Sequence, residues 1–294
     1  MKKALCLLNA FVQTEGPIHF YHRMKDELAL LGFDLEYKTN ADINIYIGSD
    51  GKLQSHLEDY SFVLYLDKDL YVSYLLEDLG YILFNNAKAI RLCDDKMLTH
   101  MALSNQGIKM PKTISAPLNY SGLISLPFIS ALEKELNYPF VAKDNFGSLG
   151  KNVFLIKNHD ELLSFEKTHY QSPRLYQEFI SSSFGFDYRL IVIGNKFVAG
   201  MKRVNSEGDF RSNIACHGKG EKAEIPLSYI EVAEKASKIL NLDYCGIDIL
   251  KGKNGEPILC EVNSNAFLKG IEEVTGENIA QKYASLIANK INTK

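Results

Sequence analysis

Hydrophobic and polar positions alternate along the first third of the chain in a way that predicts strands and helices in turn. Residues 4–8 form an uninterrupted apolar run, as in a buried strand, and apolar side chains at helical spacing follow over 18–31. Short apolar runs at 43–48 and 62–66 predict two further strands, with helix between and after them. This alternation is typical of a small α/β domain, which we expect to end near residue 90.

Beyond that point the pattern favours strands that turn back on themselves. A helix is expected over about 95–106, with Asp94 as its N-cap, followed by a loop rich in Pro and Ser at 111–127. The remaining chain predicts strands at 138–143, 152–157, 175–180, 187–193, 196–204, 245–250 and 258–263, and helices at 159–168, 228–240 and 276–291. Short turns within the last two strand pairs make them antiparallel hairpins, so we expect an α/β (α+β) fold.

Composition argues against several classes of protein but does not indicate a function. The 294 residues suffice for about two domains, and 33 basic against 36 acidic side chains give a formal net charge of −3. Such a balance favours neither nucleic acid nor a membrane surface as a partner. The five cysteines show no CxxC spacing, which argues against a disulfide framework and a zinc cluster. No apolar stretch approaches the roughly 20 residues of a membrane span, so we expect a cytoplasmic location.

The hairpin at 245–263 carries the most informative pattern. Asn254-Gly255 is the strongest short hairpin signal, and if these two residues occupy the turn, Asp248 lies directly opposite Glu261. Strand alternation then gathers three polar side chains on one face: Asp248, Glu261 and Asn263.

Two directly opposed carboxylates repel each other unless a cation lies between them. Three oxygen-bearing side chains, with neither His nor Cys among them, form the ligand set that Mg²⁺ prefers. The same alternation turns Cys260 to the opposite face, with the apolar residues. The face therefore predicts a magnesium site, with a solvated polar face as the alternative.

Two lysines and a glycine loop are candidates for binding phosphate. Lys143 ends a predicted strand just before 145–151, a loop with two glycines whose amides could cradle an anion. Lys96 lies in the first turn of its helix, where the helix dipole favours a bound anion. A plain surface turn, and pairing of Lys96 with Asp94 and Asp95, are the alternatives. The chain has neither a GxxxxGK[ST] loop nor a dinucleotide fingerprint, which disfavours P-loop and Rossmann proteins.

The segment 202–213 adds Lys202, Arg203 and Arg211, followed by Ser212-Asn213. A planar guanidinium suits phosphate or carboxylate recognition, whereas a solvated surface arginine is the alternative.

Taken in order, these motifs resemble the ATP-grasp superfamily, and most closely its RimK-like α-L-glutamate ligases. The resemblance covers Asn85 to Ile291 and is carried by DDKMLT, YPFVAK, GSLG, YQEFI, GFDYRLIVIG, GDFRSN, CGIDIL, EVNSN and GIEEVTG. It implies an ATP-grasp fold in which two antiparallel-sheet lobes clasp ATP, preceded by a small α/β pre-ATP-grasp domain. The expected domains are 1–90, 91–180 for the small central lobe, and 181–294 for the C-terminal lobe with the metal hairpin.

The resemblance also implies roles for single residues. ATP would contact Lys96, Lys143, Ser148, Gln177, Glu178, Phe179, Ile180, Asp187, Lys202, Arg211, Ser212 and Asn213. The transferring phosphoryl group would be steadied by Arg203, Arg211 and Asn213. Two Mg²⁺ ions, for which Mn²⁺ is an expected substitute, would be carried by Asp248, Glu261 and Asn263.

The implied reaction joins a carboxylate to an amine through an acylphosphate, with ATP converted to ADP. L-Glutamate is the expected amine, and a small-molecule or peptide carboxylate its partner. A lysine-biosynthesis or D-alanine type of ligase and a non-catalytic ATP sensor are the alternatives, and a homodimer or homotetramer is a candidate assembly. Where the family often reads N-x-S-P-G, this chain continues from Asn263 with Ser264-Asn265-Ala266-Phe267, so we expect a different wall at the acceptor site. Phe267 and Lys269 predict an anionic or apolar partner there.

Overall fold

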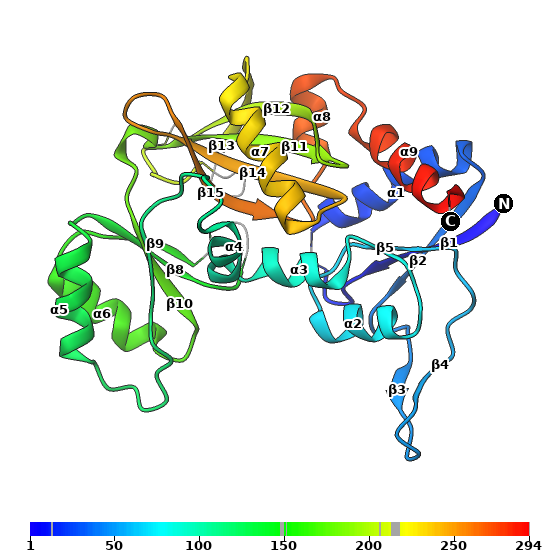
Figure 1. Ribbon diagram of the computed structural model, residues 1–294, viewed down its shortest axis with the longest axis horizontal. Helices are drawn as coiled ribbons and strands as arrows, with labels where there is room; N and C mark the ends of the chain where they lie inside the picture. The colour runs from blue at the N-terminus through cyan, green and yellow to red at the C-terminus, as the bar shows by residue number, and fades with distance from the viewer. Residues whose placement is uncertain (13, 148–149, 151, 206, 213–217, 294) are drawn as a thin grey trace.

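The first sheet of the protein is parallel and belongs to the small α/β domain that the sequence predicts. A computed structural model describes all residues except 13, 148–149, 151, 206, 213–217 and 294 (Figure 1). Its first sheet has the order β2-β1-β5-β6 and is built from β1 (Lys2–Leu8), β2 (Phe33–Thr39), β5 (Val63–Tyr65) and β6 (Leu83–Phe84). Its helices are α1 (Glu15–Leu30), α2 (Leu70–Asp78) and α3 (Ala87–Asp94).

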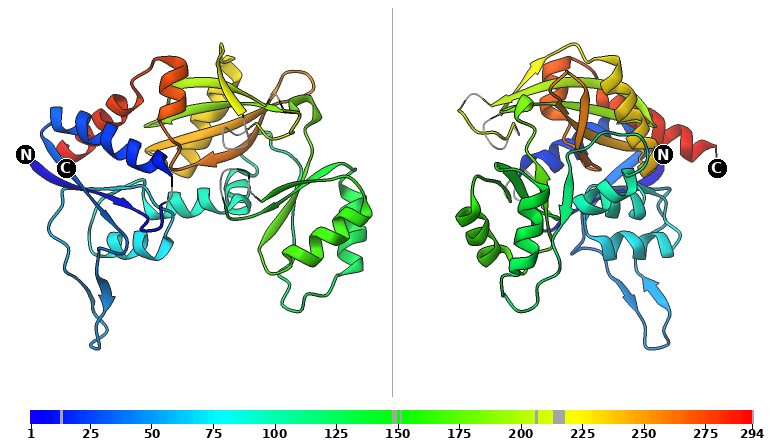
Figure 2. Two further views of the ribbon diagram at one scale, coloured as in Figure 1. Left: turned by 180° about the vertical axis from the view of Figure 1, so that it is seen from behind. Right: turned by 60° about the vertical axis from the view of Figure 1, so that its left-hand side comes forward.

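A separate hairpin of β3 (Ile45–Ile47) and β4 (Leu53–Ser55) projects away from this sheet (Figures 1 and 2). The predicted strand at 43–48 therefore exists but does not join the parallel sheet. Strand β2, which the sequence analysis did not anticipate, takes the edge position beside β1.

The second sheet is antiparallel, with the order β7-β10-β8-β9. Its strands are β7 (Thr113–Ser115), β8 (Phe140–Asp144), β9 (Val153–Ile156) and β10 (Arg174–Glu178), and α5 (Leu126–Glu135) and α6 (His159–His169) cover one face (Figure 1). Helix α5 is not predicted by the sequence analysis. Ser125 caps it and a proline stands in its first turn, while Ile129 and Leu132 enter the core of the lobe.

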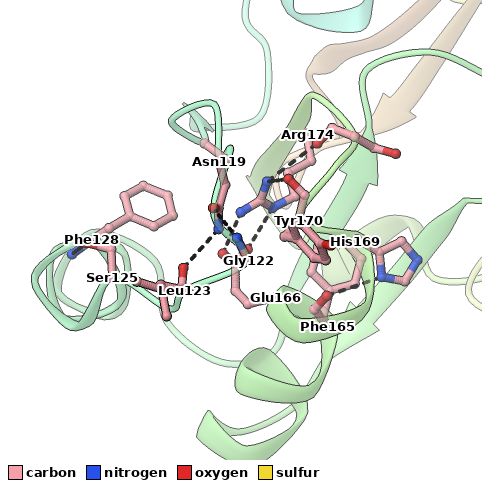
Figure 3. Close-up of polar contacts among 12 residues, drawn as sticks. Asn119, Gly122, Leu123, Ser125, Phe128, Phe165, Glu166, His169, Tyr170 and Arg174 are labelled. Atoms are coloured by element: carbon pink, nitrogen blue, oxygen red, sulfur yellow. Dashed lines mark hydrogen bonds and ion pairs between the residues drawn. The ribbon is translucent and has the colours of Figure 1, made fainter.

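A buried ion pair fixes α6 to this sheet. Arg174 Nε donates to Glu166 Oε1 at 2.7 Å and Nη2 donates to Oε2 at 2.5 Å, while Nη1 reaches the carbonyls of Tyr170 and Ser172 (Figure 3). The Tyr176 hydroxyl donates to the same carboxylate. Burial alone would lower the pKa of Arg174, but Glu166 raises it. The pair thus finds its partners inside its own lobe.

The third sheet, also antiparallel, has the order β13-β12-β11-β14-β15. It consists of β11 (Phe186–Ile193), β12 (Lys196–Asn205), β13 (Gly218–Lys222), β14 (Tyr244–Lys251) and β15 (Pro257–Asn263), with η1 (Ser181–Ser183) before it. One face packs on α7 (Leu227–Leu240), and the other faces a core shared with the first domain.

The chain ends in two helices rather than the single one predicted at 276–291. Gly276, at φ 75°, ends α8 (Lys269–Thr275), and α9 (Ile279–Asn292) starts after the Asn278 cap. Helix α9 lies alongside α1 (Figure 2), so the end of the chain helps to build the core of the first domain. The three sheets fall within 1–90, 91–180 and 181–294, whose boundaries stay a prediction.

The cap of α4 (Lys96–Leu103) differs from the prediction by one residue. Asp95, not Asp94, accepts from the amides of Met97 and Leu98. Asp94 is the last residue of α3 and pairs instead with Lys68 at 2.8 Å. In the part of the chain that the structure describes, no helix combines the length and the apolar character that crossing a membrane demands.

Candidate functional site

The predicted register of the β14–β15 hairpin is confirmed at its two carboxylates. Asp248 pairs with Glu261 across the ladder. The turn, however, holds three residues instead of two, since the Gly252 amide donates to the Glu256 carbonyl at 2.8 Å. A bulge in β15 compensates for this extra residue before the ladder reaches Asp248.

The same bulge overturns one prediction. Cys260 does not face the apolar core, because its Sγ lies 3.8 Å from Lys143 Nζ and the residue lines a cavity with Asp248 and Glu261. Burial raises the pKa of the Cys260 thiol.

Four charged side chains form a buried cluster on this face, which we call the ion cluster: Asp187, Arg189, Arg203 and Asp248. Arg189 donates to the Asp248 carboxylate from Nε and from Nη2, the latter at 2.8 Å from Oδ2. Arg203 Nη2 lies 3.0 Å from the same oxygen. Arg203 Nε also donates to Asp187 Oδ1 at 2.7 Å. Burial would raise the pKa of Asp248, but the two guanidinium groups lower it. Likewise, burial opposes the charge of Arg203, and Asp187 and Asp248 raise its pKa.

Arg189 is a residue that the sequence reasoning missed. It stands directly opposite Asp248 in the β11–β14 ladder. Placing the predicted strand 187–193 beside 245–250 would have revealed it, but the sequence gives no order for strands joined by a long connection.

The donor set of the hairpin fits a divalent cation. Glu261 is only partly buried, and the Nδ2 atom of Asn263 is buried without a hydrogen-bond partner among the described residues. An unpaired buried N–H donor of this kind calls for an acceptor beside the hairpin, such as a water or a phosphate oxygen. Two carboxylates and one amide are hard oxygen donors, as Mg²⁺ requires. Within the described ranges no group of three or more His, Cys, Asp or Glu side chains is suited to a metal.

One cavity opens between the second and third sheets, and we call it the inter-lobe cavity. It brings together ten of the predicted site residues: Lys143, Gln177, Glu178, Phe179, Ile180, Asp187, Arg211, Ser212, Asp248 and Glu261. Apolar and aromatic groups line one part of it, and the Phe179 and Phe210 rings meet edge to face at 6.0 Å. Charged groups line the rest, so a flat apolar moiety with an anionic tail would suit the cavity.

Lys96 reaches the same region from the start of α4. Its Nζ donates to the Gly147 carbonyl at 2.9 Å and lies 3.7 Å from Glu261. Burial lowers the pKa of Lys96, and nearby Lys143 lowers it further, against the opposing effect of Glu261. The alternative in which Asp94 and Asp95 pair with Lys96 is not found, since both carboxylates have other partners.

Arg211 makes further contacts besides lining the cavity, Lys202 lies apart from it, and two predicted residues are not described by the structure. Arg211 pairs with Asp209 at 2.6 Å and donates to the Gly150 carbonyl at 2.8 Å, which ties two loops over the cavity. Lys202 lies 4.7 Å from the centre of the Phe186 ring and does not line the inter-lobe cavity. Ser148 and Asn213 lie outside the described residues.

The Gln177 side chain is held by a network that the sequence did not suggest. Its Nε2 lies 2.8 Å from His100 Nε2 and 2.9 Å from the Thr113 hydroxyl. Burial lowers the pKa of His100 to about 4, so the imidazole is neutral and can accept from the amide.

A second cavity, of about 370 Å³, lies between the first domain and the third sheet, and we call it the inter-domain cavity. Glu261 borders both cavities, which therefore meet at the hairpin. Of the two residues predicted for the acceptor site, Phe267 lines the inter-domain cavity, whereas Lys269 is exposed and does not line it.

Comparisons with known proteins show the family of the chain. A family model described as the RimK-like ATP-grasp domain matches residues 93–287. Human N-acetylaspartylglutamate synthase A is 32% identical over 229 residues, covering 76% of this chain and 58% of that protein. A probable alpha-L-glutamate ligase of Vibrio atlanticus is 36% identical over 208 residues, covering 69% of this chain and 66% of the relative. The chain thus spans little more than half of the human relative.

Solved structures extend the likeness to the first domain. A RimK domain ATP-grasp protein from Sphaerobacter thermophilus has a TM-score of 0.74 at 18% identity, covering 97% of this chain and 99% of the other. The ATP-grasp ligase PsnB, solved with a minimal precursor, Mg and ADP, has a TM-score of 0.69 at 14% identity, covering 99% and 98%. These likenesses confirm the predicted ATP-grasp fold.

Proposed function

Because the chain belongs to the RimK-like ATP-grasp family, we propose that it is an ATP-dependent ligase that joins a carboxylate to an amine. The carboxylate oxygen attacks the γ-phosphorus of ATP, its new P–O bond forms as the bond to ADP breaks, and an acylphosphate results. The amine then attacks the acyl carbon, forms the C–N bond, and releases phosphate and a proton.

One observation carries the proposal: Glu261 borders both cavities, and Asp248, which lies opposite it in the ladder, lines the inter-lobe cavity. A nucleotide in the inter-lobe cavity and a carboxylate in the inter-domain cavity would meet at this hairpin. The geometry therefore supports transfer of a group between two ligands.

The inter-lobe cavity supports a nucleotide. Phe179, Ile180 and Phe210 offer apolar contacts for adenine, with the Gln177-Glu178 edge beside them. Asp187 is proposed to lie by the ribose, and Lys96 and Lys143 to neutralise the phosphates. Lys202 does not line the cavity, and its contact with ATP stays a proposal that rests on the family resemblance alone.

The hairpin face supports a magnesium site. We assign Asp248, Glu261 and Asn263 to two Mg²⁺ ions, which would offset the charge of the phosphate tail when bound. Arg203 and Arg211 then stabilise charge that develops on the phosphoryl oxygens, and Asn213 and Ser148 keep their proposed phosphate contacts. Arg189 holds Asp248 in place for this task.

L-Glutamate is the proposed amine, because glutamate occurs in the names of both sequence relatives. The test is a screen of amino acids and small carboxylates for phosphate release from ATP with Mg²⁺. Release that peaks with glutamate and one carboxylate supports the proposal. A peak with lysine-pathway or D-alanine substrates would instead indicate a ligase of that specificity. ATP binding with no turnover for any pair would indicate a non-catalytic sensor.

A further inference from the structure

A carboxylate of the first domain, that of Asp67, borders the inter-domain cavity. Three parallel strands, β1, β2 and β5, end at the same edge of their sheet, followed by Asn9, Asn40 and Asp67. In open parallel sheets this edge is where ligands bind. Asn9, Asp67 and Lys68 line the cavity.

Asp67 is a buried carboxylate surrounded by amides. Asn9 Nδ2 lies 3.2 Å from both of its oxygens, Asn40 Nδ2 lies 3.1 Å from Oδ2, and the Lys68 amide donates at 2.7 Å. Only 7% of Asp67 is exposed. The adjacent ammonium group of Lys68 turns to Asp94 instead.

No cation pairs with Asp67 among the residues that the structure describes. A buried charge in a protein is normally paired, and here the pairing is incomplete. Burial accordingly raises the pKa of Asp67. A ligand with a positive charge would complete the pair.

The opposite wall of the cavity carries two guanidinium groups beside the Glu261 carboxylate. Arg189 and Arg203 line it from the third sheet, where they also pair with Asp248, beside the hairpin where the two cavities meet. A molecule that spans the cavity thus meets guanidinium groups near the proposed reaction centre and a carboxylate on the first domain. This arrangement of charges is complementary to a zwitterion.

We infer that the inter-domain cavity binds an unacylated amino acid, with its ammonium group on Asp67 and the carboxylate that reacts toward Arg189 and Arg203. The inference rests on the proposed function and names the class of its carboxylate substrate. An N-acylated or purely anionic carboxylate would leave Asp67 without a cation. Asp67 is then a specificity-determining residue.

Binding can be measured without turnover. Isothermal titration calorimetry, with Mg²⁺ and a non-hydrolysable ATP analogue present, would compare the twenty L-amino acids with their N-acetyl derivatives. We expect at least one free amino acid to bind about tenfold or more tightly than its N-acetyl form, because losing one partner of a buried charge pair costs at least that factor.

Two variants test the role of Asp67. Asp67→Asn should bring the free and N-acetyl forms within about threefold of each other, since the attraction for ammonium is gone. Asp59→Asn removes the same charge from an exposed position of the same domain and should leave the preference intact. If no free amino acid binds, if an N-acetyl form binds equally well, or if Asp67→Asn keeps the preference, the inference is wrong.

The product gives an independent check. An amino acid activated at its carboxylate keeps its amine, so the product should react with fluorescamine. A product without a primary amine would overturn the inference while leaving the ligase proposal intact. Absence of phosphate release with every pair, despite binding of a free amino acid, would instead refute the ligase proposal alone.

Discussion

The protein contains two buried clusters of carboxylate and guanidinium groups whose surroundings differ. In the small lobe, Arg174 and Glu166 bond to each other, and further bonds come from Tyr176 and backbone carbonyls of the same lobe. In the ion cluster, Asp248 binds two arginines, yet a neighbouring polar group at the hairpin lacks a hydrogen-bond partner. Asn263 has an unpaired buried nitrogen there.

This difference separates a structural ion pair from a functional one. Both clusters are buried and both perturb pKa values, so neither burial nor a pKa shift distinguishes them. What distinguishes them is that the ion cluster lies between two cavities and faces a second carboxylate, Glu261. Substitutions in the small-lobe pair should therefore lower stability alone, whereas substitutions in the ion cluster should also lower activity.

The largest effect is expected from Asp248→Asn. Loss of this carboxylate weakens cation binding and leaves phosphoryl charge uncompensated, which should lower kcat by about a hundredfold or more. It also leaves Arg189 and Arg203 underpaired, so we expect a loss of unfolding free energy of about 3 kcal/mol. Opposed carboxylates alone would predict a gain in stability for this variant, but its two arginine partners reverse the sign.

Steady-state phosphate release and urea unfolding check both parts. In Glu261→Gln the replaced carboxylate is 25% exposed, so we expect a similar loss of activity with little change in stability. Near-normal kcat in both variants at saturating Mg²⁺ would refute the metal assignment.

Glu166→Gln should affect stability alone. It removes one partner of a buried pair and leaves Arg174 uncompensated, at a cost of about 3 kcal/mol of unfolding free energy. Below the unfolding transition, kcat and the KM for ATP should match those of the native protein, because Glu166 contacts neither the ion cluster nor the inter-lobe cavity. A selective rise in the KM for ATP would contradict the structural assignment.

The pH dependence of ATP affinity should reveal Lys96. Since burial lowers its pKa below the ordinary 10.5, Lys96 loses its proton at a lower pH than an exposed lysine does. The Kd for ATP should therefore rise as pH approaches 10.5 from below. Lys96→Met should raise the Kd by about tenfold at pH 8 and flatten the curve, because one charge-assisted contact is removed. Exposed Lys269→Met serves as the control, and an equally steep curve in Lys96→Met would remove Lys96 from the site.

The smallest effect is expected one residue from the ion cluster. Ile247→Val shortens a side chain that packs on the α7 side of the sheet, and should cost about 1 kcal/mol of stability with activity retained. A large loss of kcat without loss of stability would show that the two faces of β14 are not as separate as the register implies. Urea unfolding and phosphate release measure the two quantities.

Local patterns predicted most strands and the pairing of Asp248 with Glu261, because hairpins are set by neighbouring residues. The prediction succeeded although a wider turn and a bulge each shifted the register by one residue. The orientation of Cys260 depended on that bulge and was wrong. Contacts between distant segments, such as Arg189 with Asp248 and Asn9 with Asp67, depend on strand order and domain packing, which single-sequence patterns do not contain.

The most direct test of the central claim is the melting temperature with ATP, with and without Mg²⁺. If the hairpin of Asp248, Glu261 and Asn263 holds the metal that anchors the nucleotide, MgATP should raise the melting temperature, because a ligand that binds only the folded state stabilises it. EDTA should remove most of that rise. A rise that persists undiminished without divalent metal would contradict the assignment.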